Sequence, residues 1–278
     1  MDSQPRVALV TGCGGSIGWS TVNNLLREGW IVLGLTRQRK TLESTRGPCP
    51  QNLFLFELDA RSATSEDFHS KLSLLVSAWE KFPRIQLVVN IAAICPKNWD
   101  AFTLLETFSV NVVFPQRLYE VFHYLDMRHY PEPCSVINVS SGDGELCFFN
   151  SYWRRAIEQL ESYDELTDFM HAVVERVDQA GLQPYAVVHG DEPAYRLSKA
   201  LLNRLTLLQA RTAPSHIRID AICPGDVKSN MNPLGGQREP SAAAKDILQL
   251  AELQHRIVRE RCSSRYPHFW RLGKPIPF

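Results

Sequence analysis

Short apolar runs alternate along the chain with longer segments in which apolar residues recur every three or four positions. The short runs predict strands of a parallel sheet, because strands buried on both faces read as near-continuous stretches of Val, Ile and Leu. The predicted strands are Val7–Val10, Ile31–Leu35, Leu53–Leu58, Ile85–Val89, Ser135–Val139, Ile217–Ile222 and a short last run at Phe269–Trp270. The longer segments predict amphipathic helices at residues 16–28, 65–82, 101–129, 192–212 and 240–261. This alternation predicts the α/β class, a doubly wound parallel sheet of about seven strands with helices on both faces.

One stretch interrupts the alternation. About fifty residues separate the fifth predicted strand from the helix at 192–212, where a short connection is usual. Residues 153–180 carry their own helical pattern, with apolar side chains among many charges at Ile157, Leu160, Leu166, Phe169, Val173, Val174 and Val177. We therefore expect a helical insertion at about 150–190 that packs on the rest of the fold. Because no repeat, low-complexity tract or linker-like stretch divides the chain, we expect one domain over residues 1–278.

A glycine-rich segment, Thr11–Gly18, follows the first predicted strand and opens the first predicted helix. In that position small residues let the backbone approach a pyrophosphate, and the helix N-terminus presents free N–H groups to it. Such turns also serve as purely structural connections between a strand and a helix. The position after the first strand of a βαβ unit favours dinucleotide binding and hence a Rossmann-type fold.

The second predicted strand ends in the basic run Thr36–Lys40. An acidic residue there would bind the ribose hydroxyls of NAD, whereas Arg37 is suited to the extra phosphate of NADP. A solvated basic loop is the alternative. Asp59 ends the third strand, where it could accept a hydrogen bond from the adenine amino group or could simply cap a helix or turn.

Tyr195 and Lys199 lie four positions apart in the predicted helix at 192–212, whose start is marked by Asp191, Glu192 and Pro193. Residues four apart on a helix are neighbours, so we expect the ammonium beside the phenol. A nearby cation favours phenolate, and we therefore expect the pKa of Tyr195 to be lowered toward the neutral range. By chance alone, the same spacing occurs on many helix surfaces.

Composition narrows the possible partners. Thirty basic residues balance thirty acidic ones among 278, so no electrostatic footprint indicates nucleic acid or an anionic membrane. Seven scattered cysteines without a Cys-x-x-Cys spacing indicate neither a disulfide framework nor a metal site. No cleavable signal and no stretch of membrane-spanning length is seen, so we expect a cytoplasmic protein.

Further motifs complete a pattern that resembles the short-chain dehydrogenase/reductase family across nearly the whole chain. Beside the glycine turn and the Tyr/Lys pair, the resemblance rests on Asn90–Ala93, Asn111, Asn138–Ser141, Pro224–Val227 and the tail Phe269–Pro277. The segment between Ser141 and Tyr195 is similar to the carbonyl-reductase-like subgroup, whose members carry a helical insertion here. Many of them are monomers because the insertion covers the usual dimer surface, so the resemblance implies a monomer.

The resemblance also implies the roles of the site residues. Tyr195 would be the general acid or base, Lys199 would lower its pKa and hold the nicotinamide ribose, and Ser141 would bind the substrate carbonyl. Asn111 would position a water that links Lys199 to solvent. From the residues alone, Ser141 could instead merely end a strand, and Asn111 could be a buried amide bonded to backbone. The expected contacts to NADP(H) are Gly12, Ser16, Ile17, Gly18, Arg37, Asp59, Ala60, Asn90, Ala92, Tyr195, Lys199, Pro224, Gly225 and Val227.

Three departures from the family pattern concern the cofactor. Ser16 replaces a glycine of the turn, and Ile91 and Ala93 replace the second asparagine and the glycine of the fourth-strand motif. Gly15 stands where many NADP-dependent relatives have a basic residue, which leaves phosphate recognition to Arg37.

The sequence thus predicts an NADPH-dependent reductase of a small-molecule ketone or aldehyde. A nucleotide-binding regulator that has lost turnover is the alternative suggested by the departures, and a sugar-nucleotide epimerase is disfavoured by the short C-terminal region. Candidate walls of an apolar substrate pocket, each of which could instead belong to the core, are Trp99, Phe102, Phe148, Phe149 and Trp153. We interpret His189 as a loop histidine, and nothing marks Cys13 or Cys95 as reactive.

Overall fold

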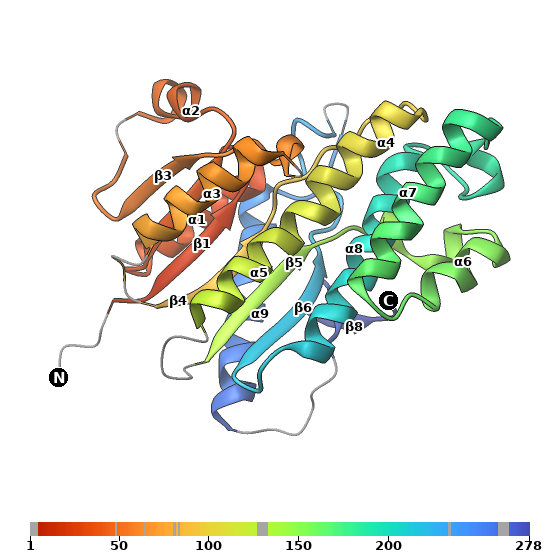
Figure 1. The fold of residues 1–278 in the computed structure, drawn as a ribbon. Coiled ribbons are helices and arrows are strands. Elements are labelled where there is room, and N and C mark those ends of the chain that lie inside the picture. Colours follow the sequence, from red (N-terminus) through yellow and green to blue (C-terminus); the bar gives the residue numbers. More distant parts are fainter. Residues whose placement is uncertain are drawn as a thin grey trace.

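The computed structural model describes residues 5–47, 49–63, 65–79, 82, 84–126, 133–232, 235–260 and 267–278. Within these ranges eight strands form one sheet in the order β3-β2-β1-β4-β5-β6-β7-β8 (Figure 1). The strands are β1 (Val7–Thr11), β2 (Ile31–Thr36), β3 (Leu53–Glu57), β4 (Ile85–Asn90), β5 (Cys134–Val139), β6 (Ile217–Cys223), β7 (Phe269–Arg271) and β8 (Lys274–Ile276). Neighbours from β3 to β7 run parallel, and only β8 is antiparallel to its partner.

The α-helices of the described residues connect these strands. They are α1 (Ser16–Arg27), α2 (Arg39–Arg46), α3 (Glu66–Trp79), α4 (Ala101–Phe108), α5 (Phe114–Asp126), α6 (Ser151–Glu158), α7 (Tyr163–Ala180), α8 (Pro193–Thr212) and α9 (Pro240–Arg259). The doubly wound α/β fold and the helical insertion predicted from the sequence are confirmed. The predicted helix ends at 80–81, 127–129 and 261, as well as Cys262, lie outside the described residues.

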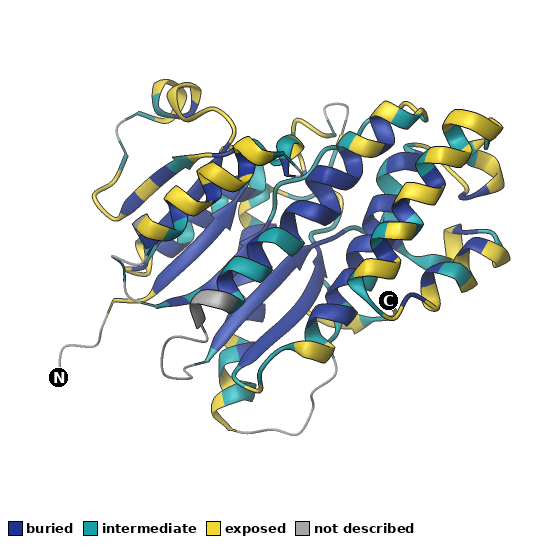
Figure 2. Cartoon of the chain, viewed as in Figure 1, coloured by how far each residue is buried: buried dark blue, intermediate teal, exposed yellow. Residues whose placement is uncertain are grey.

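Two apolar cores, one on each face of the sheet, follow from the alternation of side chains along each strand. In β1, Val7 and Leu9 belong to the core beneath α3, α4, α5 and α8, whereas Ala8 and Val10 belong to the core beneath α1 and α9. The sheet is accordingly buried between helices whose outer surfaces are exposed (Figure 2). The strands are apolar throughout because both of their faces are covered.

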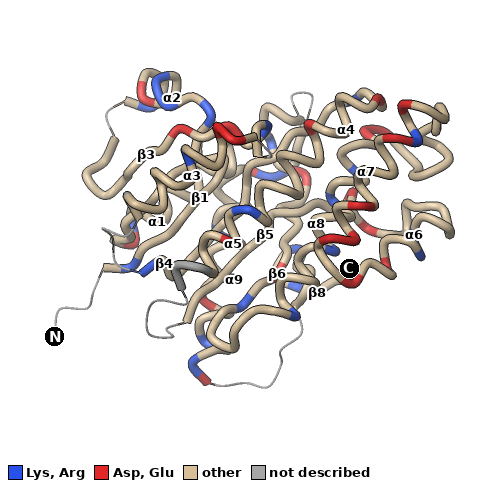
Figure 3. Tube along the Cα trace, viewed as in Figure 1, with Lys and Arg blue, Asp and Glu red and all other residues tan. Residues whose placement is uncertain are grey.

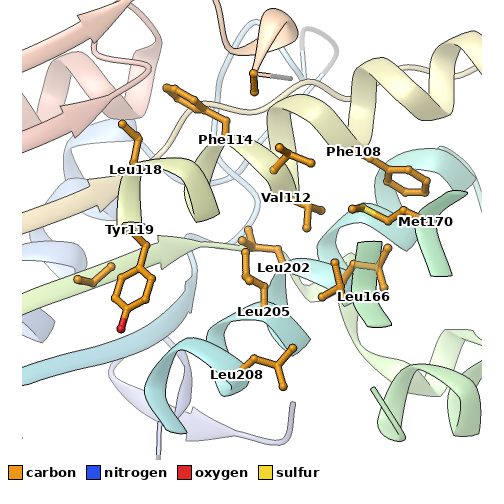
Figure 4. Close-up of a cluster of buried hydrophobic side chains, with 14 of the residues drawn as sticks. Phe108, Val112, Phe114, Leu118, Tyr119, Leu166, Met170, Leu202, Leu205 and Leu208 are labelled. Carbon is orange, nitrogen blue, oxygen red and sulfur yellow. The ribbon is translucent and has the colours of Figure 1, made fainter. Parts of the chain in front are cut away.

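The insertion forms α6 and α7. Leu166, Met170 and Val173 are the buried side of α7, which packs on α4 and α8. Figure 4 shows Met170 beside Phe108 of α4 and Leu166 toward the side chains of α8. Leu166 and Val173, two of the seven apolar positions that predicted the insertion, are therefore among the side chains that hold α7 on the fold.

Two elements depart from the sequence prediction. α2 lies where the sequence predicts only a basic loop, and it buries a single side chain, Leu42, so it leaves almost no apolar period. β8 has only three residues, too few for a recognisable apolar pattern. Its Pro275 is tolerated because the strand lies at the edge of the sheet. The predicted helix at 101–129 also contains a π-helical turn, Ser109–Val113, between α4 and α5.

Charges are dispersed over the molecule. Acidic and basic positions are intermixed along the helices in Figure 3, and neither sign collects on one side of that view. Within the described ranges, no helix combines the length and the apolar character needed to cross a bilayer.

The strand order places the site. It reverses between β1 and β4, and in open α/β sheets ligands bind beyond the carboxyl ends of the strands at such a switch point. The glycine turn follows β1, Asn90 ends β4, Ser141 follows β5 and Pro224 follows β6. The topology therefore gathers these motifs, although they are far apart in the sequence, at one edge of the sheet.

Candidate active site

The glycine turn is locked against the end of β4. Gly12 has a φ of 61°, and a Cβ on it would come within 2.9 Å of the Cα of Ala92. A Cβ on Gly18 would overlap the carbonyl oxygen of Gly12. Thr11 Oγ1 accepts hydrogen bonds from the backbone N–H groups of Ile91 and Ala92 at 2.9 and 3.0 Å. Both glycines are thus required by close backbone contact.

The N-terminus of α1 has the form of an anion site. Gly15 is its N-cap and has no side-chain capping bond, and Ser16 and Ile17 begin the helix while remaining partly accessible. The first N–H groups of a helix lack partners within it and carry partial positive charge. The turn and this helix end therefore fit a pyrophosphate, with Ser16 contributing a hydroxyl where a glycine would contribute nothing.

The end of β2 lies beside the turn, because a Cβ on Gly14 would be 3.3 Å from Thr36 Oγ1. Arg37 is exposed there. Arg39 is occupied by an ion pair with Glu43 at 2.7 Å. Of these two arginines, Arg39 is the one held by this ion pair, and contact of Arg37 with a phosphate stays a prediction.

Asp59 has the helix-cap role that the sequence left as an alternative. Its Oδ1 accepts from the backbone N–H of Arg61 at 3.0 Å, at the start of the 3₁₀ turn Ala60–Ser62. The carbonyl of Ala60 accepts from the Ser109 hydroxyl at 3.1 Å, so the turn is tied to the π-helical segment. Contact of Asp59 or Ala60 with an adenine stays a prediction.

Asn90 ends β4 in a buried amide pair. Its Nδ2 donates to Asn138 Oδ1 at 2.8 Å, and Asn138 Nδ2 donates to Thr206 Oγ1 of α8 at 2.9 Å. Asn90 Oδ1 is buried and has no partner in the described part of the chain. A buried acceptor without a donor is costly, so a donor from a ligand would stabilise this end of β4.

Lys199 and Tyr195 lie on α8 as their spacing predicts. Lys199 Nζ is 5.6 Å from the centroid of the Tyr195 ring and donates to the carbonyl oxygen of Val139 at 2.8 Å. The side chain is only 2% exposed, and burial lowers the pKa of Lys199 to about 8. The carbonyl of β5 therefore holds the ammonium within the site.

The predicted direction of the Tyr195 pKa shift is wrong. Burial raises the pKa of Tyr195 well above its usual value, and a side-chain hydrogen bond with Ser141 opposes this rise only in part. The spacing argument considered the cation alone, whereas removal of the phenolate from water is the larger effect here. In this structure Tyr195 is a protonated phenol at neutral pH.

Ser141 follows β5 and contacts an acid that the sequence analysis missed. Ser141 Oγ donates to Asp143 Oδ2 at 3.0 Å and accepts from the backbone N–H of Asp143 at 3.2 Å. Asp143 in turn pairs with Arg196 at 2.8 Å, and Arg196 follows Tyr195 directly in α8. The sequence contained both residues beside the motifs, but their separation by about fifty positions gave no signal that they meet.

Asn111 lies in the π-helical turn and is almost fully buried. Its Oδ1 accepts from the backbone N–H of Ile94 at 2.9 Å, and its Nδ2 donates to the Ile94 carbonyl at 3.0 Å and to Ser198 Oγ at 2.8 Å. These are the backbone contacts of the structural alternative, and they tie the segment after β4 to α8. A role for Asn111 in placing a water stays a prediction.

The segment after β6 is held by a second arginine. Gly225 has a φ of 79°, and a Cβ on it would come within 2.8 Å of Arg238 Cδ. Arg238 donates to the Pro224 carbonyl and pairs with Asp246 at 2.8 Å, and Val227 forms an isolated bridge with Arg238. Pro224, Gly225 and Val227 are thereby fixed at the carboxyl edge of the sheet.

A cavity of about 530 Å³ opens beside the first turn of α8. Its walls come from the segment after β4 and from the segment between the insertion and α8, and they comprise Lys97, Trp99, Pro184, Tyr185, Val188, His189, Gly190, Asp191, Glu192 and Pro193. Of the five aromatic residues predicted as pocket walls, Trp99 lines this cavity. Phe149 and Trp153 belong to the core, Phe102 is exposed, and Phe148 packs under Arg196.

The thiols of Cys13 and Cys95 lie in surroundings that disfavour the reactive thiolate. Burial raises the pKa of Cys13 to about 12, and burial together with nearby carboxylates raises the pKa of Cys95 to about 12. The thiolate is the nucleophile, so both groups are protonated and inert at neutral pH. The sequence marked neither cysteine as reactive, and the raised pKa values agree with that.

Comparison with known proteins agrees with this architecture. The family model described as short chain dehydrogenase matches residues 6–152. The chain is 27% identical to (+)-neomenthol dehydrogenase of Arabidopsis thaliana over 301 residues, which cover 94% of this chain and 96% of that protein. It is 23% identical to salutaridine reductase of Papaver bracteatum, over 88% of this chain and 90% of that protein.

Two solved structures share the fold at low sequence identity. The structure of salutaridine reductase from Papaver somniferum has a TM-score of 0.74 at 19% identity, covering 88% of this chain and 95% of that one. Menthone neomenthol reductase from Mentha piperita has a TM-score of 0.70 at 20% identity, covering 96% and 99% of the two chains.

Proposed function

Because the chain belongs to the short-chain dehydrogenase family, we propose that it is an NADP(H)-dependent oxidoreductase that reduces a ketone or aldehyde carbonyl to an alcohol. The observation that carries this proposal is the convergence of Tyr195, Ser141 and Lys199 at the carboxyl edge of the sheet, beside the glycine turn. The relatives that this chain matches over most of their length are named as a dehydrogenase and a reductase, which supports this reaction class.

The residues present fit a dinucleotide. Gly12, Gly18 and the free N-terminus of α1 at Ser16 and Ile17 would hold the pyrophosphate, and Arg37 would contact the additional phosphate of NADP(H). Asn90, Ala92 and the Pro224–Val227 segment would border the nicotinamide ribose and ring. When bound, the nicotinamide supplies the hydride.

Tyr195 is the proton donor in this proposal. A tyrosine phenol is protonated at neutral pH at its ordinary pKa, and burial raises the pKa of Tyr195 further. The phenol can therefore give its proton to the substrate carbonyl oxygen as negative charge develops there. Lys199, with a pKa near 8, is buried against the same ring and can stabilise the phenolate left after transfer.

Ser141 would hydrogen-bond the same carbonyl oxygen. Its hydroxyl donates to Asp143 in the structure, so it must rotate from the carboxylate to the substrate. Arg196 pairs with Asp143 and offsets part of its negative charge, which lowers the cost of that rotation. Asp143 and Arg196 therefore act as positioning residues for Ser141.

Substitution of Tyr195 by Phe tests the proposal. Loss of a general acid costs about 10²- to 10⁴-fold in rate, so Y195F should oxidise NADPH at no more than about 1% of the wild-type rate over a panel of ketones and aldehydes. Isothermal titration should show that both proteins bind NADPH equally and bind NADH more weakly. The exposed Tyr152, which does not line the cavity, provides the matched control, and Y152F should still turn over.

Wild-type-like turnover by Y195F would refute the proposed mechanism. Tight NADPH binding by the wild-type protein without turnover of any carbonyl would instead favour the regulatory alternative.

A further inference from the structure

The cavity beside α8 is wide enough for more than a small carbonyl group, and it has a mixed lining. Two aromatic rings, Trp99 and Tyr185, face it from opposite segments, and Trp99 Nε1 donates to the Leu182 carbonyl at 2.8 Å. That bond fixes the indole against the end of the insertion. The rest of the lining includes the charged side chains of Lys97, Asp191 and Glu192.

Glu192 has an unusual backbone conformation. Its φ of 53° and ψ of 54° are left-handed, and among the described residues other than glycine only Leu272 shares a positive φ. The following Pro193 disfavours the right-handed helical conformation at Glu192, and Arg196 N–H closes the first helical turn on the Glu192 carbonyl at 3.0 Å. Such backbone strain is typical of functional positions, and Glu192 lines the cavity.

The carboxylate of Glu192 has no structural use that the contacts reveal. It is half-buried and makes no side-chain capping bond to α8. Among the described residues no cation lies within ion-pair distance of it, whereas Asp143 is neutralised by Arg196. Lys97, Asp191 and His189 are exposed, so solvent screens their charges more than that of Glu192.

Glu192 is also close to the reacting centre. Its carboxylate contributes to the raised pKa of the Cys95 thiol, and Cys95 in turn contributes to the raised pKa of Tyr195. Glu192 precedes Tyr195 by three residues, which is one turn of α8. A substrate that reaches from Tyr195 into the cavity beside the first turn of α8 would therefore meet this carboxylate.

We propose that the cavity binds a carbonyl substrate that carries a cationic amine, with the ammonium held by Glu192 and by the rings of Trp99 and Tyr185. An unpaired, half-buried carboxylate favours a cation, and aromatic faces attract ammonium groups through their negative potential. Glu192 is then a determinant of substrate choice. This inference rests on the proposed carbonyl reduction at Tyr195.

Two ketones of the same shape test the inference. The 1,1-dimethyl-4-oxopiperidinium ion carries a permanent positive charge, and 4,4-dimethylcyclohexanone has carbon in place of the nitrogen. The ratio of kcat/KM for the cation to that for the neutral ketone should exceed one in the wild-type protein. That ratio should fall about ten-fold or more in E192Q. In the matched control E175Q, at an exposed glutamate of α7 that does not line the cavity, it should stay within about two-fold of wild type.

Binding distinguishes this inference from the proposed function. Isothermal titration of the cation into the NADPH-loaded wild-type protein and E192Q reports the Glu192 contact without turnover. If neither ketone is reduced but the cation binds and E192Q weakens its binding, the cation site at Glu192 is supported and the proposed reduction of these ketones fails. If both ketones are reduced and E192Q leaves their ratio unchanged, or changes it no more than E175Q does, the inference is overturned.

Discussion

Lys199 is held in a place where its charge costs stability. The ammonium is 2% exposed and donates to the Val139 carbonyl, and burial lowers its pKa to about 8. Between pH 8 and 10.5 the unfolded chain keeps a proton on this lysine that the folded chain has lost. This one group therefore makes stability rise with pH across that window, and its penalty is fully present below pH 8.

Substitution of Lys199 by Met should therefore stabilise the protein at pH 7 while abolishing activity. We expect a gain on the order of 2 kcal/mol in the free energy of unfolding, because the unbonded Val139 carbonyl offsets part of the relieved desolvation. Thermal melts at pH 7 and pH 10 measure it, and the gap between K199M and wild type should narrow at pH 10. A less stable K199M at pH 7 would contradict this account of the buried ammonium.

Which site residues the sequence predicts depends on how local their signals are. The sequence motifs that predict Gly12, Gly18 and the Tyr195/Lys199 pair each span only a few positions. The structure places these residues at one edge of the sheet. Asp143 and Arg196 meet only through the fold, so no spacing reveals them. The direction of the Tyr195 shift was missed for the same reason, since desolvation depends on what the tertiary structure packs around the ring.

At the scale of elements, the backbone of α8 and the backbone of the turn after β5 are in close contact. A Cβ on Gly144 would lie 2.6 Å from the carbonyl carbon of Lys199, and Gly144 ends the 3₁₀ turn that Ser141 caps. The distance between Ser141 and the Tyr195 helix is therefore set by the missing side chain of Gly144.

Substitution of Gly144 by Ala should separate these two elements. We expect a loss of about 1–3 kcal/mol in stability from overpacking, with a larger loss in kcat than in NADPH affinity, because the turn carries Ser141 and not the cofactor cradle. Denaturant unfolding, steady-state kinetics and NADPH titration measure the three quantities. Gly235, whose Cβ would meet open space, is the control. Equal stability of G144A and G235A would contradict the expected overpacking.

The elements that the sequence missed share a physical cause. α2 exposes nearly all of its residues, and β8 is held by pairing with β7 more than by any apolar run of its own. Periodicity reports burial, so an element that buries little leaves no period to read. The core strands, which are buried on both faces, were predicted to within about two residues at each end.

At the scale of the molecule, α7 covers the outer faces of α4 and α8. Its buried side belongs to the same apolar core as Leu104 and Leu201 of those helices. We propose that the insertion thereby covers the surface through which the family resemblance implies association, and that the protein is a monomer.

Light scattering during gel filtration should give a mass near 31.6 kDa. In α7, Val173 lies on the buried side and the neighbouring Ala172 on the exposed side, so V173D and A172D form a matched pair. A buried unpaired carboxylate should cost about 3 kcal/mol or more and promote association of V173D, while A172D should remain monomeric. A wild-type mass of twice the chain would contradict the proposal.

The reversal of strand order between β1 and β4 has a consequence for synthesis of the chain. β2 follows β1 closely, but the other edge of β1 must wait for β4, which begins at Ile85. At about 5–20 residues per second, that edge stays open for roughly 4–15 s after β1 has been made. α1 waits until α9 has left the ribosome, because these two helices pack together. The apolar face of α1 in a nascent chain therefore stays uncovered until α9 (Pro240–Arg259) has been made.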